Sequence, residues 1–238
     1  MIYMMLLTHL IGDYLLQTDV LVRWKMRSLW GVLAHGAIVT AVTVLGAALV
    51  DPAWWSYAAL IGVVHTLVDV VRARFIRTKD PGRELFWYVL DQVVHVTVIV
   101  WVVILAQAAL DGTPQMVWGG NPSLSRVLGY AIGYALLLNP AWVFLRFTVR
   151  GVWGSQAAPT LDQGEKYGPM VERVVIATGV LTGQFTLALL VLVLRRVTAI
   201  HVQEGQVGIM VRQTEHWGEA LLSTLLAIGV GLILRLYG

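Results

Sequence analysis

Three pairs of histidine and aspartate residues share one spacing in this 238-residue chain, with the two members four positions apart. The pairs are His9–Asp13, His65–Asp69 and Asp91–His95. On an α-helix, residues four apart project from the same face, about one turn from each other. Each pair lies in a long apolar segment, where an ionisable side chain costs several kcal/mol unless it is paired or coordinated. We therefore interpret the three pairs as parts of one site.

The composition is that of an integral membrane protein. Hydrophobic residues make up 58% of the chain and charged residues 13%, with a mean hydropathy of +0.73. Soluble domains usually contain about 25% charged residues. The chain has no cysteine, which excludes disulfides and thiolate metal sites. The net charge of +3 gives no reason to expect a nucleic-acid partner.

The apolar segments predict an all-α, polytopic transmembrane helix bundle that forms a single domain over residues 1–238. Most segments reach the length of about 20 residues that a span requires. Proline and glycine mark the joins between segments, and Asn139-Pro140 predicts a break inside the fifth. The first segment is either a full span or a re-entrant helix, because it becomes amphipathic toward its end. The seven expected helices cover residues 1–22, 28–50, 53–76, 83–110, 123–150, 169–198 and 214–236.

Lysine and arginine predict the orientation, because they are enriched in cytoplasmic loops. If all seven segments span, one side receives 13 of the 17 basic residues. These are Arg23, Lys25, Arg27, Arg72, Arg74, Arg77, Lys79, Arg83, Arg146, Arg150, Lys166, Arg173 and Arg235. Only Arg126, Arg195, Arg196 and Arg212 fall on the other side. We therefore expect a bacterial inner-membrane protein with its N-terminus outside and its C-terminus in the cytoplasm.

The order of the pairs indicates that they lie at one depth. Histidine comes first in the two pairs on helices that run toward the cytoplasm, and aspartate comes first in the pair on the helix that runs away from it. The rise of about 1.5 Å per residue puts every aspartate roughly 10–14 Å, and every paired histidine roughly 16–20 Å, from the cytoplasmic helix ends. His35, in the second segment, falls level with the aspartates. The first four helices are therefore predicted to share a polar centre.

Four imidazoles and three carboxylates at one level are a ligand set for zinc, manganese or iron(II). The predicted ligands are His9, Asp13, His35, His65, Asp69, Asp91 and His95. Zinc is the expected metal, as one or two ions, and a carboxylate not used as a ligand can orient an imidazole or act as a base. The alternative is a buried polar network without metal that holds the helices together or relays protons.

Further polar residues lie near this layer or near its cytoplasmic side, and we expect them to bind substrate. They are Gln17, Asp19, Gln92, Arg72, Glu172 and Arg173. Helix-end solvation or ion pairing between neighbours is the alternative for most of them. Lys25, Arg72 and Arg74 are most simply basic anchors at the membrane surface, and they can also attract a lipid phosphate.

These motifs resemble an uncharacterised domain-of-unknown-function family of small bacterial membrane proteins. Its signature is H-x-x-G-D-[FY]-x-x-Q-T, a histidine in the second helix, H-x-x-x-D and D-Q-x-x-H. Here these read HLIGDYLLQTD (9–19), His35, HTLVD (65–69) and DQVVH (91–95). A later glycine-rich turn before Glu-Arg is similar to GEKYGPMVER (164–173). The repeated H-x-x-x-D pairs are more loosely similar to membrane-bound metal-dependent hydrolases and to the helical zinc phospholipase C and nuclease superfamily, which implies phosphoester hydrolysis by analogy.

Two functions from different classes fit this pattern. The first is a metal-dependent hydrolase that acts from the cytoplasmic side on an amphiphile, such as a phospholipid or an isoprenoid phosphate, with Asp13, Asp69 and Asp91 as catalytic carboxylates. The second is a divalent-cation or proton-coupled transporter that uses the same cluster. A third interpretation is a structural scaffold, in which the polar core only fixes the packing of the helices. The expected partner is membrane lipid, and a homo-oligomer is compatible with the sequence.

Overall fold

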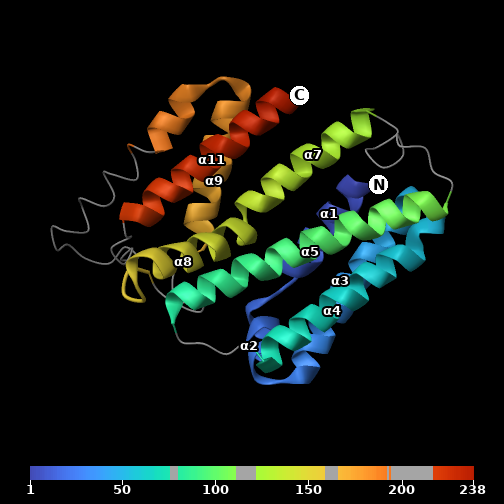
Figure 1. Cartoon of the computed structure of the whole chain (residues 1–238). Coiled ribbons are helices and arrows are strands. Elements are labelled where there is room, and N and C mark those ends of the chain that lie inside the picture. Colours follow the sequence, from blue (N-terminus) through green and yellow to red (C-terminus); the bar gives the residue numbers. More distant parts are fainter. Residues whose placement is uncertain (76–79, 111–121, 159–165, 192, 194–216) are drawn as a thin grey trace. The chain divides into compact units, whose positions relative to one another are not determined.

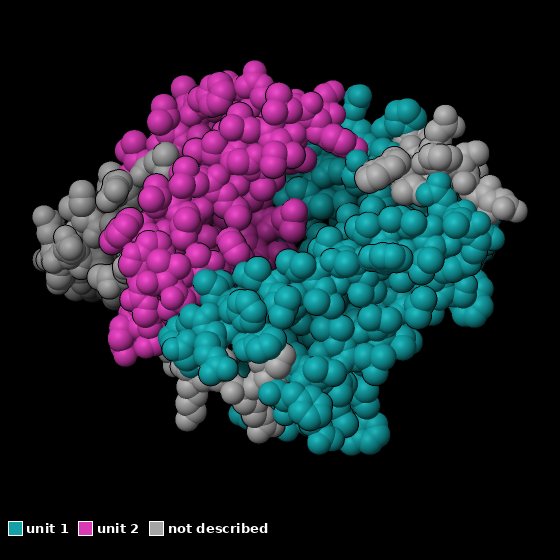
Figure 2. Space-filling model, in the orientation of Figure 1, with its two compact units in different colours: residues 1–135 teal, residues 136–238 magenta. Residues whose placement is uncertain are grey.

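The computed structural model is helical throughout the part of the chain that it describes (Figure 1). The described residues divide into two compact units, Met1–Ala135 and Leu136–Gly238 (Figure 2). The single domain expected from the sequence stays a prediction. The description omits residues 76–79, 111–121, 159–165, 192 and 194–216.

The N-terminal segment is not one continuous helix. Helix α1 (Ile2–Leu10) runs into a π-helical turn (Ile11–Leu15), and a separate amphipathic helix, α2 (Asp19–Arg27), follows. The Thr18 side chain accepts a hydrogen bond from Leu21 N at 3.3 Å and so caps the start of α2. The expected helix over 1–22 is therefore wrong beyond residue 15. The apolar part is about 21 Å long, which is shorter than the hydrocarbon core of a bilayer.

Three long helices complete the framework of unit 1. Helix α3 (Leu29–Val50), helix α4 (Trp55–Phe75) and helix α5 (Pro81–Ala109) are each long and apolar enough to cross a membrane. Asp51 accepts from the Ala53 amide at 2.9 Å at the join between α3 and α4. Together with the prolines that follow the joins, such caps explain why these boundaries agree with the sequence prediction.

Small residues bring α3 and α4 into close contact. A Cβ atom added to Gly36 of α3 would overlap Thr66 of α4, and one added to Gly62 of α4 would overlap Thr40 of α3. Glycine at both crossing points lets the two backbones approach, as is usual in membrane helix packing. This approach matters for the site, because His35 and His65 each lie within three residues of such a contact.

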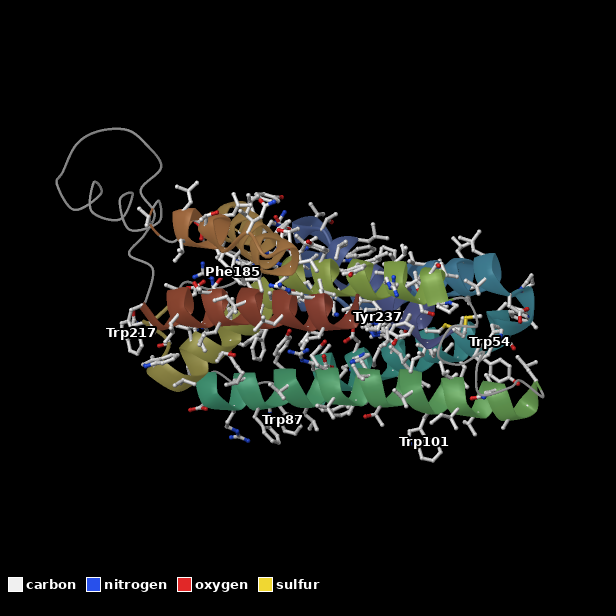
Figure 3. All side chains as sticks on the ribbon, turned by 90° about the horizontal axis from the view of Figure 1, so that it is seen from above. Trp54, Trp87, Trp101, Phe185, Trp217 and Tyr237 are labelled. Atoms are coloured by element: carbon white, nitrogen blue, oxygen red, sulfur yellow. The ribbon has the colours of Figure 1, made fainter. Side chains whose placement is uncertain are left out.

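The apolar core of unit 1 lies toward one end of the helices. It joins the start of α1, the end of α3, the start of α4 and the second half of α5. The largest buried members include Met5, Trp54, Ile61 and Ile99. In Figure 3, Trp87 and Trp101 project from the outer face of α5, away from this core. The basic residues of α2, of the last turn of α4 and of the first turn of α5 lie toward the other end.

Leu138 separates helix α7 (Pro122–Leu137) from helix α8 (Asn139–Trp153). The break predicted at Asn139-Pro140 is therefore confirmed. The break frees backbone carbonyls, because proline has no N–H to donate. The buried Arg173 guanidinium donates from Nε to Leu137 O at 2.7 Å and from Nη2 to Leu138 O at 3.3 Å. This pairing accounts for a charged side chain that is only 1% exposed.

The rest of unit 2 consists of α9 (Tyr167–Thr182), a short helical segment over 185–191 and α11 (Trp217–Tyr237). The single helix expected over 169–198 is wrong, because α9 ends at Gly183 in the left-handed conformation (φ 75°). Residues 194–198 of that expected helix lie outside the described residues. Among the described helices, four are long enough to span, or five if α7 and α8 form one broken span. The all-helical membrane fold is confirmed, and the described residues contain fewer continuous candidate spans than the seven expected.

Candidate metal centre

The histidines and aspartates singled out in the sequence come together inside unit 1. All seven side chains are buried, with exposed fractions between 0% and 8%. The three pairs and the lone histidine therefore meet from five different helical elements. His9 comes from α1, Asp13 from the π-helical turn, His35 from α3, His65 and Asp69 from α4, and Asp91 and His95 from α5.

The imidazole rings form one contiguous group. The ring centroid of His65 lies 4.9 Å from that of His9, 4.4 Å from that of His95 and 5.2 Å from that of His35. His9 and His95 are 5.6 Å apart. His65 is therefore at the middle of the group, which agrees with the layer expected from the mirrored order of the motifs.

The Nε2 atoms of His35 and His65 lie at ligand spacing from each other and from carboxylate oxygens of Asp13 and Asp69. His35 Nε2 lies 3.1 Å from Asp13 Oδ1, 3.3 Å from His65 Nε2 and 3.5 Å from Asp69 Oδ2. His65 Nε2 lies 3.6 Å from Asp69 Oδ2 and 4.0 Å from Asp13 Oδ1. Bonds of about 2.0–2.1 Å in a tetrahedral zinc site separate neighbouring ligand atoms by about 3.4 Å. We call these four residues the tight set.

Several buried polar atoms of the cluster make no hydrogen bond in the structure. They are both ring nitrogens of His9, Nδ1 of His65, Nε2 of His95 and Oδ1 of Asp91. A buried donor or acceptor without a partner costs about 1–3 kcal/mol. The donor atoms of His9, His65 and His95 lie within 4.8 Å of one another, as do those of Asp69, Asp91 and His95. A metal cation would provide a partner, because each of these side chains can donate a lone pair to it.

Two of the residues are already oriented as ligands. His95 Nδ1 lies 2.7 Å from the backbone carbonyl of Asp91, an acceptor, so this nitrogen carries the proton and Nε2 carries the lone pair. Asp91 Oδ2 accepts hydrogen bonds from Arg72 Nη1 at 2.9 Å and from Gln92 Nε2 at 3.0 Å. Asp91 is thus held through Oδ2, while its buried Oδ1 makes no hydrogen bond in the structure.

Two cations contact the carboxylates from the basic end of unit 1. Arg72 pairs with Asp91, and Lys25 Nζ of α2 lies 2.5 Å from Asp69 Oδ2. The position of Lys25 was not predicted as part of the site, since the sequence suggested a surface anchor. Its side chain reaches Asp69 of α4 because α2 packs against α3, which in turn packs against α4. Spacing along the chain does not reveal this arrangement.

A pair of tyrosines beside the cluster was also missed. The hydroxyl groups of Tyr14 and Tyr88 lie 3.0 Å apart and both side chains are buried. Tyr14 follows Asp13 in the π-helical turn, and Tyr88 precedes Asp91 by three residues, which puts it on the same face of α5. That spacing is the signal by which Tyr88 could have been found.

The residues expected to bind substrate divide into two groups. Arg72 and Gln92 contact Asp91, and Gln17 Nε2 lies 3.3 Å from His35 Nδ1. The other group comprises Asp19, Glu172 and Arg173. Asp19 is exposed at the start of α2, Glu172 is half-buried in α9 of unit 2, and Arg173 binds the carbonyls at the α7–α8 break, so their role in substrate binding stays a prediction.

Residues 1–118 match a family model described as "Protein of unknown function (DUF3307)". The matched segment contains all seven residues of the cluster, together with Lys25 and Arg72, and ends before Glu172 and Arg173. The first half of the chain is therefore similar to an uncharacterised domain family. No curated protein and no solved structure was found to match the chain.

Proposed function

We propose that the protein is a membrane-embedded, metal-dependent hydrolase that acts on an amphiphilic phosphoester, of the phospholipid or isoprenoid phosphate type. The observation that carries this proposal is the tight set of Asp13, His35, His65 and Asp69. The Nε2 atoms of His35 and His65 lie 3.1–4.0 Å from each other and from carboxylate oxygens of Asp13 and Asp69, while further buried imidazole nitrogens of the cluster make no hydrogen bond in the structure. Nitrogen and oxygen ligands of this kind fit zinc best, with manganese and iron(II) as the other candidates.

The cluster has enough ligands for one or two ions. The tight set would hold the first ion, and His9 and His95 offer donor atoms for a second. A divalent ion bound there supplies a Lewis acid that activates water and polarises a phosphoryl group. Hydrolysis then forms a bond between the water oxygen and phosphorus and breaks the ester P–O bond.

Asp91 is the residue best placed to move the proton. Its Oδ1 is without a partner, while Arg72 and Gln92 hold Oδ2 and so fix the orientation of the carboxylate. In this scheme Oδ1 takes the proton of the attacking water and the leaving oxygen receives it. Asp13 and Asp69 act as ligands, and the buried site around them excludes bulk water.

The depth of the site favours a lipid substrate. Asp91 lies ten residues into α5, about 15 Å along the helix from its start at the basic end. Substrates that reach such a site are those that partition into the bilayer, with a polar head near the basic helix ends. We place those ends on the cytoplasmic side, as the distribution of lysine and arginine predicts.

The proposal is tested by reconstituting the full chain, loaded with zinc, manganese or iron(II), into liposomes that contain a phospholipid or an isoprenoid phosphate. We expect phosphoester cleavage by the wild type and a loss of about 100-fold or more in the Asp91→Asn variant, as for removal of a general base. Asp80→Asn is the matched control, since Asp80 caps α5 far from the cluster and asparagine caps equally well.

A fluorescent indicator for the same cation inside the liposomes distinguishes the alternative. Cleavage without cation flux supports the hydrolase. Cation flux that depends on His65, without cleavage of any phosphoester, would contradict it and assign the cluster to transport.

A further inference from the structure

Lys25 and Arg72 reach the buried carboxylates from the outer side of unit 1. The side chain of Lys25 is 23% exposed and that of Arg72 is 32% exposed, whereas those of their partners Asp69 and Asp91 are 4% and 6% exposed. Both cations sit on long flexible side chains at the basic end of the unit. Either one can therefore turn outward without breaking a packed core.

The charges of the site predict the kind of ligand that accompanies the metal. Asp13, Asp69 and Asp91 with Lys25 and Arg72 leave one net negative charge when the imidazoles are neutral. One divalent ion turns this into one net positive charge, and a second ion increases it further. An excess of positive charge at low dielectric is costly unless an anion neutralises it. The metal-loaded site therefore calls for an anionic ligand.

A groove between α4 and α5 begins at Arg72 and Asp91. A donor atom of Asp69, the partner of Lys25, lies within 4.8 Å of one of Asp91. The groove has a volume of about 320 Å³ and includes both Arg72 and Asp91 in its lining. Along α4 it extends from Arg72 to Val64, which is about 12 Å of helix. Its other walls are apolar and include Leu67, Val68, Val71, Trp87, Leu90 and Val94. A charged head at Arg72 and a hydrocarbon chain toward Val64 fit this arrangement.

We propose that Lys25 and Arg72 form the phosphate-binding site of the protein, and that the α4–α5 groove holds the hydrocarbon chain of the same phosphorylated membrane lipid. This inference rests on the proposed metal centre. When the metal takes Asp69 as a ligand, the Lys25 ammonium loses its partner and binds a phosphate oxygen instead. Arg72 keeps Asp91 through Nη1 and offers other N–H donors of its guanidinium to the phosphate.

Native mass spectrometry of the full chain in detergent tests this proposal, because one spectrum reports both bound metal and bound lipid. The probes are the non-hydrolysable phosphonate analogue of phosphatidic acid, diacylglycerol with the same acyl chains, and inorganic phosphate. The wild type loaded with zinc should bind the phosphonate lipid at least tenfold tighter than diacylglycerol. Without zinc this preference should disappear, since Lys25 then stays on Asp69.

Single substitutions distinguish two roles of Lys25 and Arg72: binding a phosphate, or only neutralising the carboxylates of Asp69 and Asp91. Lys25→Met and Arg72→Gln should each retain zinc and diacylglycerol and lose about tenfold in phosphonate-lipid affinity. Arg27→Met and Arg74→Gln are the matched controls, being exposed on the same helices, and should leave the preference unchanged. Val68→Phe, which fills the groove, should weaken both lipids equally and leave zinc unaffected.

The outcomes that overturn the inference are distinct from those that overturn the proposed function. Zinc-loaded wild type without a preference for the phosphonate lipid, or with the same preference in Lys25→Met and Arg72→Gln, contradicts the inference and leaves the metal centre intact. If inorganic phosphate binds as tightly as the phosphonate lipid, the groove holds no hydrocarbon chain and that part of the inference is wrong. If the wild type binds no divalent metal, both the inference and the proposed function are wrong.

Discussion

His9 is the side chain whose burial is hardest to explain without a cation. Both of its ring nitrogens are buried and make no hydrogen bond among the described residues, although the side chain lies against His65 and His95. An imidazole in a purely structural core normally donates from one nitrogen and accepts at the other. A metal ion that takes the lone pair satisfies one of these nitrogens directly, and this makes His9 the most informative residue for mutation.

Replacing His9 with leucine should change stability in opposite directions with and without metal. In chelator, His9→Leu should raise the free energy of unfolding by about 1–3 kcal/mol, because it removes buried polar atoms without partners. In zinc it should lose part or all of the stabilisation that bound ligand gives the wild type. Thermal unfolding in detergent measures both. A variant destabilised equally in the two conditions would show that His9 only fills space.

Replacing Asp69 with asparagine removes charge and keeps shape. We expect Asp69→Asn to reduce zinc affinity at least tenfold and to abolish hydrolysis, because Asp69 Oδ2 lies at ligand spacing from both His35 and His65. Zinc titration monitored by calorimetry gives the affinity. Unchanged affinity, together with equal or higher stability, would show a packing network in which a buried charge was dispensable.

The convergence of the seven residues could be predicted from the sequence, but the side chains that surround them could not. Spacing of four along a helix fixes a face, and the reversed order of Asp91 and His95 fixes a depth. The Lys25–Asp69 contact depends on how α2 packs against α3, and the periodicity of the sequence carries no information on that packing. The hydroxyl contact between Tyr14 and Tyr88 likewise depends on the π-helical turn.

At the scale of helices, the close approach of α3 and α4 positions half of the site. Gly36 and Gly62 give each backbone access to a threonine of the other helix. His35 and His65 lie beside these crossing points, so the separation of the helices sets the 3.3 Å between their Nε2 atoms. The tight set therefore tolerates little change in the distance between these two helices.

A methyl group at Gly36 should push the helices apart. We expect Gly36→Ala to destabilise the protein by about 1–3 kcal/mol through overpacking and to weaken zinc binding. Gly229→Ala is the control, because a Cβ there meets no atom within 4 Å, and it should be neutral or stabilising by up to about 1 kcal/mol. Chemical unfolding and zinc titration of both variants check this. Equal behaviour of the two variants would contradict the close approach.

Helix boundaries could be predicted where proline and an aspartate cap mark them, as at Asp51-Pro52 and Asp80-Pro81. They could not be predicted where apolar composition continues past the end of a helix. The segment over 1–22 ends early because Thr18 caps a new helix, and the segment over 169–198 ends at Gly183 because its backbone is left-handed. In both cases a local feature, a helix cap or a left-handed residue, ends the helix although the apolar sequence continues.

For the whole molecule, the two units carry different kinds of polar residue. Unit 1 contains the cluster and the matched family segment. Unit 2 contains a buried pair between Arg146 and Glu219, 3.3 Å apart, and Arg173 at the α7–α8 break. Composition predicted a membrane protein but not this division, because apolar helices look alike in sequence whichever unit they join.

The distribution of basic residues predicts the orientation of the chain. A reporter fused after Arg77 should be cytoplasmic, and one fused near Gly119 should be outside, because α5 is expected to cross the membrane between these two positions. Enzymatic reporters active on only one side of the membrane measure this. The opposite pattern would reverse the predicted orientation and the side from which the substrate enters.

The most direct measurement of the central claim is the metal content of the purified full chain, prepared without chelator, beside that of the His65→Ala variant. His65 lies at the middle of the imidazole group and belongs to the tight set. Elemental analysis should find one or two transition-metal ions per wild-type chain, most of them zinc, and a clear loss in the variant. Wild type without metal, or stoichiometric metal that survives His65→Ala, would contradict the metal centre.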